Sequence, residues 1–184
     1  MFKERKAAQL AAALLDRAGG RLNVLKLTKL LYLVEREAMK RYGFQVSDDQ
    51  MVSMPKGPVL SHTLDLTNGS VESAEWDAFV EDRERHDVKL KNVVAREDLS
   101  ALNDATIEIV DAIWAEFGHM SQWDLVNYTH DQCAEWEDPD GSSLPIPAKR
   151  VFMATGRSAT EAEVMAKELR AQQYFDQLLE DVDG

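Results

Sequence analysis

One apolar stripe constrains this sequence more than any other feature. The stripe consists of residues at helical spacing: Leu27, Leu30, Leu31, Val34 and Ala38. Charged residues flank it, and it stops before Gly43, a residue type that readily adopts the left-handed conformation closing a helix. We therefore expect a long amphipathic helix at the centre of the core.

Helical periodicity also occurs in several other segments. Residues 2–18 form one such segment, which ends at Gly19 and Gly20. Further helices are expected over residues 102–117 and 121–130, with a helical turn or two over 148–155. A last helix extends to about residue 180 and has its own apolar stripe: Val164, Ala171, Phe175 and Leu178. Helices therefore dominate the predicted structure.

The region from Phe44 to Gly69 has a different character, because turn-forming residues exclude a long helix there. It predicts a strand over residues 50–54, a tight turn and a short helix near 59–66. A second strand is expected over 86–94, and the two strands could pair in a small antiparallel sheet. The predicted class is α+β, a mainly helical single domain over residues 1–184 with a small antiparallel sheet.

Composition excludes several classes of protein. A chain of 184 residues buries enough surface to fold without disulfides or metal. The single cysteine, Cys133, excludes a disulfide scaffold and a cysteine-rich zinc module. The amino terminus resembles neither a signal peptide nor a membrane span, so we expect a cytoplasmic protein with no membrane partner.

The charge is acidic overall and unevenly distributed. With 21 basic and 33 acidic residues the net charge is −12, which disfavours generic nucleic-acid binding. Residues 1–60 nevertheless carry 11 basic and 6 acidic side chains, whereas residues 61–184 carry 10 and 27. This polarity could steer a charged partner, or it could reflect two solvated faces of opposite sign.

Sequence signatures of catalysis and of cofactor binding are weak. The stretch 129–133 places His130 near Asp131 and Cys133, the residue types of nucleophilic catalysis, but side chains so close in sequence seldom face one another. A buried Cys133 that packs as a small apolar residue is the alternative. The four histidines are scattered and the glycines form no phosphate loop, so we expect no metal and no cofactor.

A series of short motifs is more specific than any of these patterns. In order, the motifs are Lys26-Leu27-Thr28-Lys29-Leu30-Leu31-Tyr32-Leu33, Arg36-Glu37-Ala38, Arg41-Tyr42-Gly43, Met54-Pro55-Lys56-Gly57-Pro58-Val59-Leu60-Ser61, Asp65-Leu66-Thr67-Asn68-Gly69, and Thr129-His130 followed by Trp136. This combination resembles the Panacea domain of the SocA-like antitoxins of bacterial toxin–antitoxin systems. The family-like core spans about 7–137, and residues 145–180 form a C-terminal helical extension.

The resemblance implies a non-enzymatic antitoxin that binds and neutralises a cognate protein toxin, usually encoded by the adjacent gene. One alternative is a proteolytic adaptor that delivers the toxin to an ATP-dependent protease. Another is an enzyme that uses His130 with Asp131 or Cys133. Binding, adaptor function and catalysis make different demands on the same residues, so all three readings stay open at this point.

Physical properties single out the residues that could bind the partner. The candidates are Lys29, Tyr32, Arg36, Lys40, Met54, Lys56, Gly57, Pro58, His130 and Trp136. Lys29, Arg36 and Lys40 lie on neighbouring turns of the central helix and could form a cationic row or be merely solvated. The Met54–Ser61 loop is stiffened by two prolines and could display Lys56, or Gly57 could simply shape the turn. Trp136 could contribute interface energy or close over the core edge.

Overall fold

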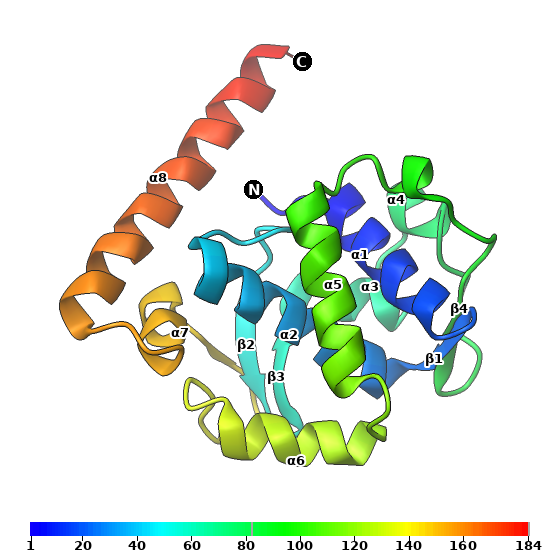
Figure 1. Ribbon diagram of the computed structural model, residues 1–184, viewed down its shortest axis with the longest axis horizontal. Helices are drawn as coiled ribbons and strands as arrows, with labels where there is room; N and C mark the ends of the chain where they lie inside the picture. Colours follow the sequence, from blue (N-terminus) through cyan, green and yellow to red (C-terminus); the bar gives the residue numbers. More distant parts are fainter. Residues whose placement is uncertain (82, 184) are drawn as a thin grey trace.

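The computed structural model describes residues 1–81 and 83–183 (Figure 1). In chain order its elements are α1 (Glu4–Arg17), β1 (Arg21–Asn23), α2 (Val24–Tyr42), β2 (Met51–Met54), β3 (Gly57–Leu60), α3 (Ser61–Thr67), α4 (Ala74–Asp77), β4 (Asp87–Lys89), the 3₁₀ helix η1 (Arg96–Leu99), α5 (Asp104–Phe117), α6 (Gln122–Gln132), β5 (Leu144–Pro145), α7 (Ala148–Ala154) and α8 (Ala159–Asp183). The predicted class, a mainly helical α+β domain with a small antiparallel sheet, is confirmed.

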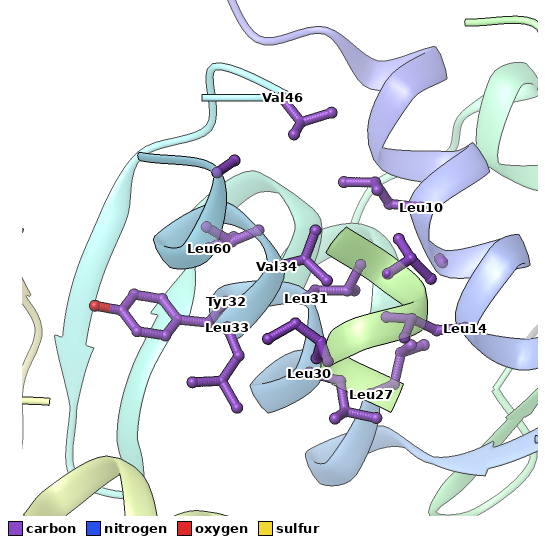
Figure 2. Packing of buried hydrophobic residues seen from close by; sticks show 14 of the residues in the cluster. Leu10, Leu14, Leu27, Leu30, Leu31, Tyr32, Leu33, Val34, Val46 and Leu60 are labelled. Atoms are coloured by element: carbon purple, nitrogen blue, oxygen red, sulfur yellow. The ribbon is translucent and has the colours of Figure 1, made fainter. Parts of the chain in front are cut away.

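Helix α2 is the central helix, as the apolar stripe predicts. It packs against α1, α3, α5, α6 and α7 and also against strand β3. Figure 2 shows Leu27, Leu30 and Leu31 near Leu10 and Leu14 of α1, all of them buried. The helix ends at Gly43, whose φ of +76° is left-handed and whose N–H donates to the Met39 carbonyl. The structure therefore confirms the long central helix and its end at Gly43.

Strands β2 and β3 form a hairpin in which Met51 pairs with Leu60 and Met54 pairs with Gly57. The strand expected over residues 50–54 is confirmed. The helix expected near 59–66 begins only at Ser61, because Val59 lies in β3 and pairs with β2. Strand β3 is at the edge of its sheet, a position that tolerates proline in the strand.

The expected pairing of the two predicted strands is wrong. Strand β2 lies between β3 and β5, so both of its hydrogen-bonding edges are occupied. Strand β4, which falls within the predicted strand over 86–94, pairs instead with β1, with Leu22 opposite Val88. The described residues therefore form two small antiparallel sheets, β1-β4 and β3-β2-β5, and the first of them joins a strand before α2 to a strand after it.

Two buried carboxylates fix the connection from α2 to the hairpin. Glu35 accepts hydrogen bonds from the backbone N–H groups of Val46 and Ser47, at 2.6 and 2.7 Å. Its burial raises the pKa of this carboxyl above the ordinary value. Asp49 accepts from the N–H and the hydroxyl of Thr63, at 2.8 and 2.6 Å, and so caps α3. These bonds set where the hairpin begins and where it ends.

Helix α8 does not bury the stripe that its sequence displays. Ala162, Ala166 and Leu169 are its buried residues, whereas Val164 and Phe175 of the expected stripe are 50% and 62% exposed. The helix therefore packs through two alanines and one leucine, whereas Val164 and Phe175 face solvent. Among the helices of the described residues, none has both the length and the apolar character of a membrane span.

Candidate functional site

Helix α2, the β2–β3 hairpin and helix α6 meet around Lys29. This side chain is fully buried, and its Nζ donates to the Pro58 carbonyl of β3 at 2.8 Å. Burial lowers the pKa of Lys29 to about 7. Proline has no N–H to donate in strand pairing, but the Pro58 carbonyl can still accept a hydrogen bond. The bond from Lys29 to this carbonyl therefore ties the central helix to the hairpin.

One helical turn later, α2 binds the loop that follows α6. The Tyr32 hydroxyl donates to Glu135 Oε1 at 2.6 Å, and Arg36 Nε donates to the same oxygen at 2.6 Å. Arg36 Nη2 also reaches Glu135 Oε2, at 3.3 Å. Burial, and then the Glu135 charge, raises the pKa of Tyr32 well above its ordinary value. The carboxylate is fully buried and is compensated by the guanidinium beside it.

Figure 2 shows how Tyr32 reaches this position. Its ring points away from Leu27, Leu30 and Leu31 of the same helix, which lie on the side of α1. Tyr32 and Arg36 are four residues apart, so their side chains project from the same face of the helix. The Tyr32 hydroxyl and the Arg36 guanidinium can therefore both donate to Glu135.

Helix α6 closes over the hairpin turn. Gly57 has a φ of +94°, and a Cβ built on it would lie 2.6 Å from Thr129 Oγ1 and 3.0 Å from Lys29 Nζ. Only glycine fits at this point without displacing those groups. Trp136 Nε1 donates to the Met54 carbonyl at 3.0 Å, and its ring lies 4.2 Å from the His130 ring, centroid to centroid. The turn is therefore held between two buried side chains and one aromatic pair.

The expected cationic row on α2 is wrong as a surface feature. Lys29 points into the molecule, and the Arg36 side chain is only 15% exposed. Lys40 is the exposed member, and it pairs with Glu37 at 3.4 Å rather than joining the other two. The physical reason is that α2 is covered on nearly all sides, so even its polar positions lie against other elements.

The candidate residues thus separate into two groups. The buried group is Lys29, Tyr32, Gly57 and Pro58. The remaining group reaches the surface at least in part: Arg36, Lys40, Met54, Lys56, His130 and Trp136. Of these ten candidates, all except Lys40 and Lys56 belong to the junction, by which we mean the contact region of α2, the β2–β3 hairpin, α6 and the loop after α6. Partner binding by the surface group stays a prediction.

A groove lies beside the tip of the hairpin. It has a volume of about 400 Å³, and Lys56, Arg83, His86 and Trp123 are among its lining residues. Trp123 is 56% exposed, and Lys56 Nζ lies 5.8 Å from the centroid of its ring. No acidic residue lines the groove in the part of the chain that the structure describes. In a chain of net charge −12 this groove is a local cationic surface that includes an exposed tryptophan.

Burial shifts the pKa values of two of the residues named for catalysis, Cys133 and His130. Cys133 is buried, and burial raises the pKa of its thiol to about 12, so the reactive thiolate is not formed near neutral pH. Burial, and then the Lys29 charge, lowers the pKa of His130. Within the described residues, no three His, Cys, Asp or Glu side chains gather as metal ligands would. The junction is suited to holding a surface in shape.

Two important residues were not singled out from the sequence. Glu135 lies in an acidic stretch, and the sequence does not distinguish its carboxylate from the neighbouring ones. The only signal is that Tyr32 and Arg36 project from one face of the helix and both need an acceptor, which Glu135 provides. Trp123 was assigned only to a helix. Its neighbours Gln122 and Asp124 are polar, which would have favoured an exposed position.

Comparison with known proteins identifies the class to which this fold and this junction belong. A sequence model of the family described as antitoxin SocA-like, Panacea domain, matches residues 27–137. The match covers more than half of the chain and includes most of α2, the whole hairpin and α6. The chain therefore belongs to the SocA-like Panacea-domain antitoxin family, and the predicted resemblance is confirmed. No curated protein and no solved structure matches the chain.

Proposed function

We propose that this protein is an antitoxin that neutralises one cognate protein toxin by direct binding, with the adjacent gene as the source of that toxin. Membership of the SocA-like family supports a toxin–antitoxin role. The observation that carries direct binding is the clamped hairpin, whose turn is held by Lys29, Thr129 and Trp136 beside an exposed tryptophan.

Preorganisation is what the buried network contributes. A loop that is already fixed loses little conformational entropy when a partner docks on it. Lys56 and Trp123 stand on this fixed support, and tryptophan is among the residue types that dominate interface energies. The toxin segment that fits here is acidic and carries an apolar group, because the groove combines Lys56 and Arg83 with the Trp123 ring.

The groove alone is too small to account for neutralisation. A stoichiometric inhibitor needs a Kd of about 1 nM, which corresponds to roughly −12 kcal/mol. Interfaces of that strength commonly bury about 1,600 Å² in total. The toxin must therefore cover neighbouring surface as well, including Met54, His130 and Trp136 at the hairpin and α6.

The first test is co-expression with the neighbouring open reading frame. That product should arrest growth when expressed alone and should become harmless beside this protein. With both proteins purified, an equimolar amount of this protein should inhibit the toxin. A proteolytic adaptor would not inhibit under these conditions, because no protease is present.

The second test locates the surface. Lys56→Glu combined with Trp123→Ala should weaken binding by at least about a hundredfold, since it removes an aromatic anchor and inverts a charge. Arg5→Glu is the control, because Arg5 is an exposed cation on α1 whose replacement makes the same charge change. A harmless neighbouring product, or a toxin that stays lethal beside the wild-type protein, would refute the proposal.

A further inference from the structure

Helix α8 has two apolar faces, and only one of them is covered. The covered face carries Ala162, Ala166 and Leu169. The other face carries four large apolar residues that are 60%, 62%, 42% and 66% exposed: Tyr174, Phe175, Leu178 and Leu179. A helix that is apolar on two sides is typical of a buried helix.

The exposed face belongs to a helix that is anchored to the rest of the molecule. Lys3 Nζ donates to Asp176 at 2.5 Å, and Gln173 Nε2 donates to Gln45 and to Asp48 at 3.0 and 3.2 Å. In Figure 1 the C-terminal part of α8 extends beyond the other helices. The four apolar side chains are thus presented on a positioned helix.

We propose that this face of α8 inserts into an apolar groove on the toxin, with lysine and arginine on the rim of that groove. The inference rests on the proposed function and adds a second contact to it. Helix insertion of this kind reads its anchors at spacings of three and four residues, which is the spacing of Tyr174, Leu178, Phe175 and Leu179.

Charge complementarity defines the rim. The sequence from 171 to 184 holds four acidic residues and no lysine or arginine. A groove with a cationic rim attracts such a segment, whereas an acidic rim would repel it.

The exposed area disfavours a second copy of this chain as the occupant. The four side chains leave about 450 Å² of surface exposed if each has about 200 Å² to bury. Two such faces pressed together bury about 900 Å², below the roughly 1,200 Å² at which stable interfaces begin. Two copies would also bring like charges together. A groove encloses the helix on more than one side and so buries more of it.

The position of α8 in the sequence has a consequence for specificity. The family match ends at residue 137, so α8 lies outside it. A contact made by α8 is therefore not part of what the matched family region provides. It would add affinity for the toxin of this particular chain.

The test compares two variants in the full-length protein. Phe175→Ser with Leu178→Ser removes two anchors. Gln177→Ser is the control at an exposed position of the same helix. Its helix-propensity cost is about that of the test variant, because phenylalanine and serine have similar helix propensities, and so do leucine and glutamine. Titration with the purified product of the neighbouring reading frame should show at least about thirtyfold weaker binding for the first variant and wild-type binding for the second. Both should retain wild-type helicity and melting temperature.

The possible outcomes separate the proposals. Wild-type affinity in the Phe175 and Leu178 variant, together with weak binding by the Lys56 and Trp123 variant, would overturn the role of α8 and leave the proposed function standing. A wild-type dimer in light scattering that this variant converts to a monomer, with toxin affinity unchanged, would assign the face to a second copy and overturn the inference. If the wild-type protein does not neutralise the product, the proposed function itself fails.

Discussion

Replacing Gly57 with alanine tests whether the hairpin turn is held as tightly as its surroundings indicate. The added Cβ would lie 2.6 Å from Thr129 Oγ1 and 3.0 Å from Lys29 Nζ. Lys29 is held by its bond to the Pro58 carbonyl, and Thr129 Oγ1 donates within α6. Neither group can retreat without losing a hydrogen bond.

Two costs add in this variant. A left-handed conformation costs a non-glycine residue roughly 1–2 kcal/mol. Overpacking a filled interior costs roughly 1–3 kcal/mol more. We therefore expect Gly57→Ala to lower the free energy of unfolding by about 2–5 kcal/mol, a large part of the stability of a domain of this size.

Gly20 provides a matched control. Its φ is also +94°, but no heavy atom lies within 4 Å of the position of an added Cβ. Gly20→Ala should therefore lose only the conformational part, roughly 1–2 kcal/mol. Urea denaturation of both variants, followed by circular dichroism, measures the two losses on the same scale.

The difference between the two losses isolates the steric clash. Equal losses for Gly57→Ala and Gly20→Ala would refute the tight packing of the turn against α6. A double-mutant cycle adds a second check, because Thr129→Ala removes the nearest atom. The loss from Gly57→Ala should then be smaller in the Thr129→Ala background than in the wild type.

Three further predictions concern buried titratable groups. Between about pH 7 and 10.5, folded Lys29 has lost a proton that the unfolded chain keeps, so the free energy of unfolding should rise by up to about 1.4 kcal/mol per pH unit. Below pH 7 Lys29 should contribute no slope. Lys29→Met should remove the rise, as measured by urea titrations at several pH values. Glu135→Gln should cost roughly 3 kcal/mol, because its buried partners lose their charged acceptor, whereas exposed Glu137→Gln should be nearly neutral by the same measurement. Cys133 should react with a thiol reagent in urea but not in buffer, and rapid labelling of the native protein would contradict its burial.

Local periodicity was sufficient to predict the longer helices of this fold, namely α1, α2, α5, α6 and α8, but not the short helices α4 and η1. The apolar stripe of α2 and its closing glycine are local features, so the sequence specifies them directly. Strand pairing depends on residues far apart in the chain, and β4 paired with β1 rather than with β2. The short apolar run at Val59 and Leu60 is compatible with either a helix or a strand, and the hairpin register decided in favour of a strand.

The candidate site was predictable in its residue types but not in their orientation. Lys29 was expected on a cationic row or in solvent because lysine is mostly exposed in proteins, and Tyr32 was expected either at the core edge or in a surface patch. Nothing in a helical period shows that a hairpin and a second helix will cover the polar side of α2. The distant acceptor Glu135 is unrecognisable for the same reason, because its role exists only once α6 has docked.

The residues that carry the family resemblance therefore lie mainly inside the molecule, and this restricts where a partner can bind. Lys29 is buried, and Glu135 is buried beside Tyr32 and Arg36. Burying these groups costs desolvation free energy, a cost that apolar residues in the same places would not have. What these groups contribute is one fixed arrangement of α2, the hairpin and α6. A toxin cannot touch most of them directly. We propose that its contacts fall on the residues that this scaffold displays, such as Trp123, or on segments beyond the family match, such as α8.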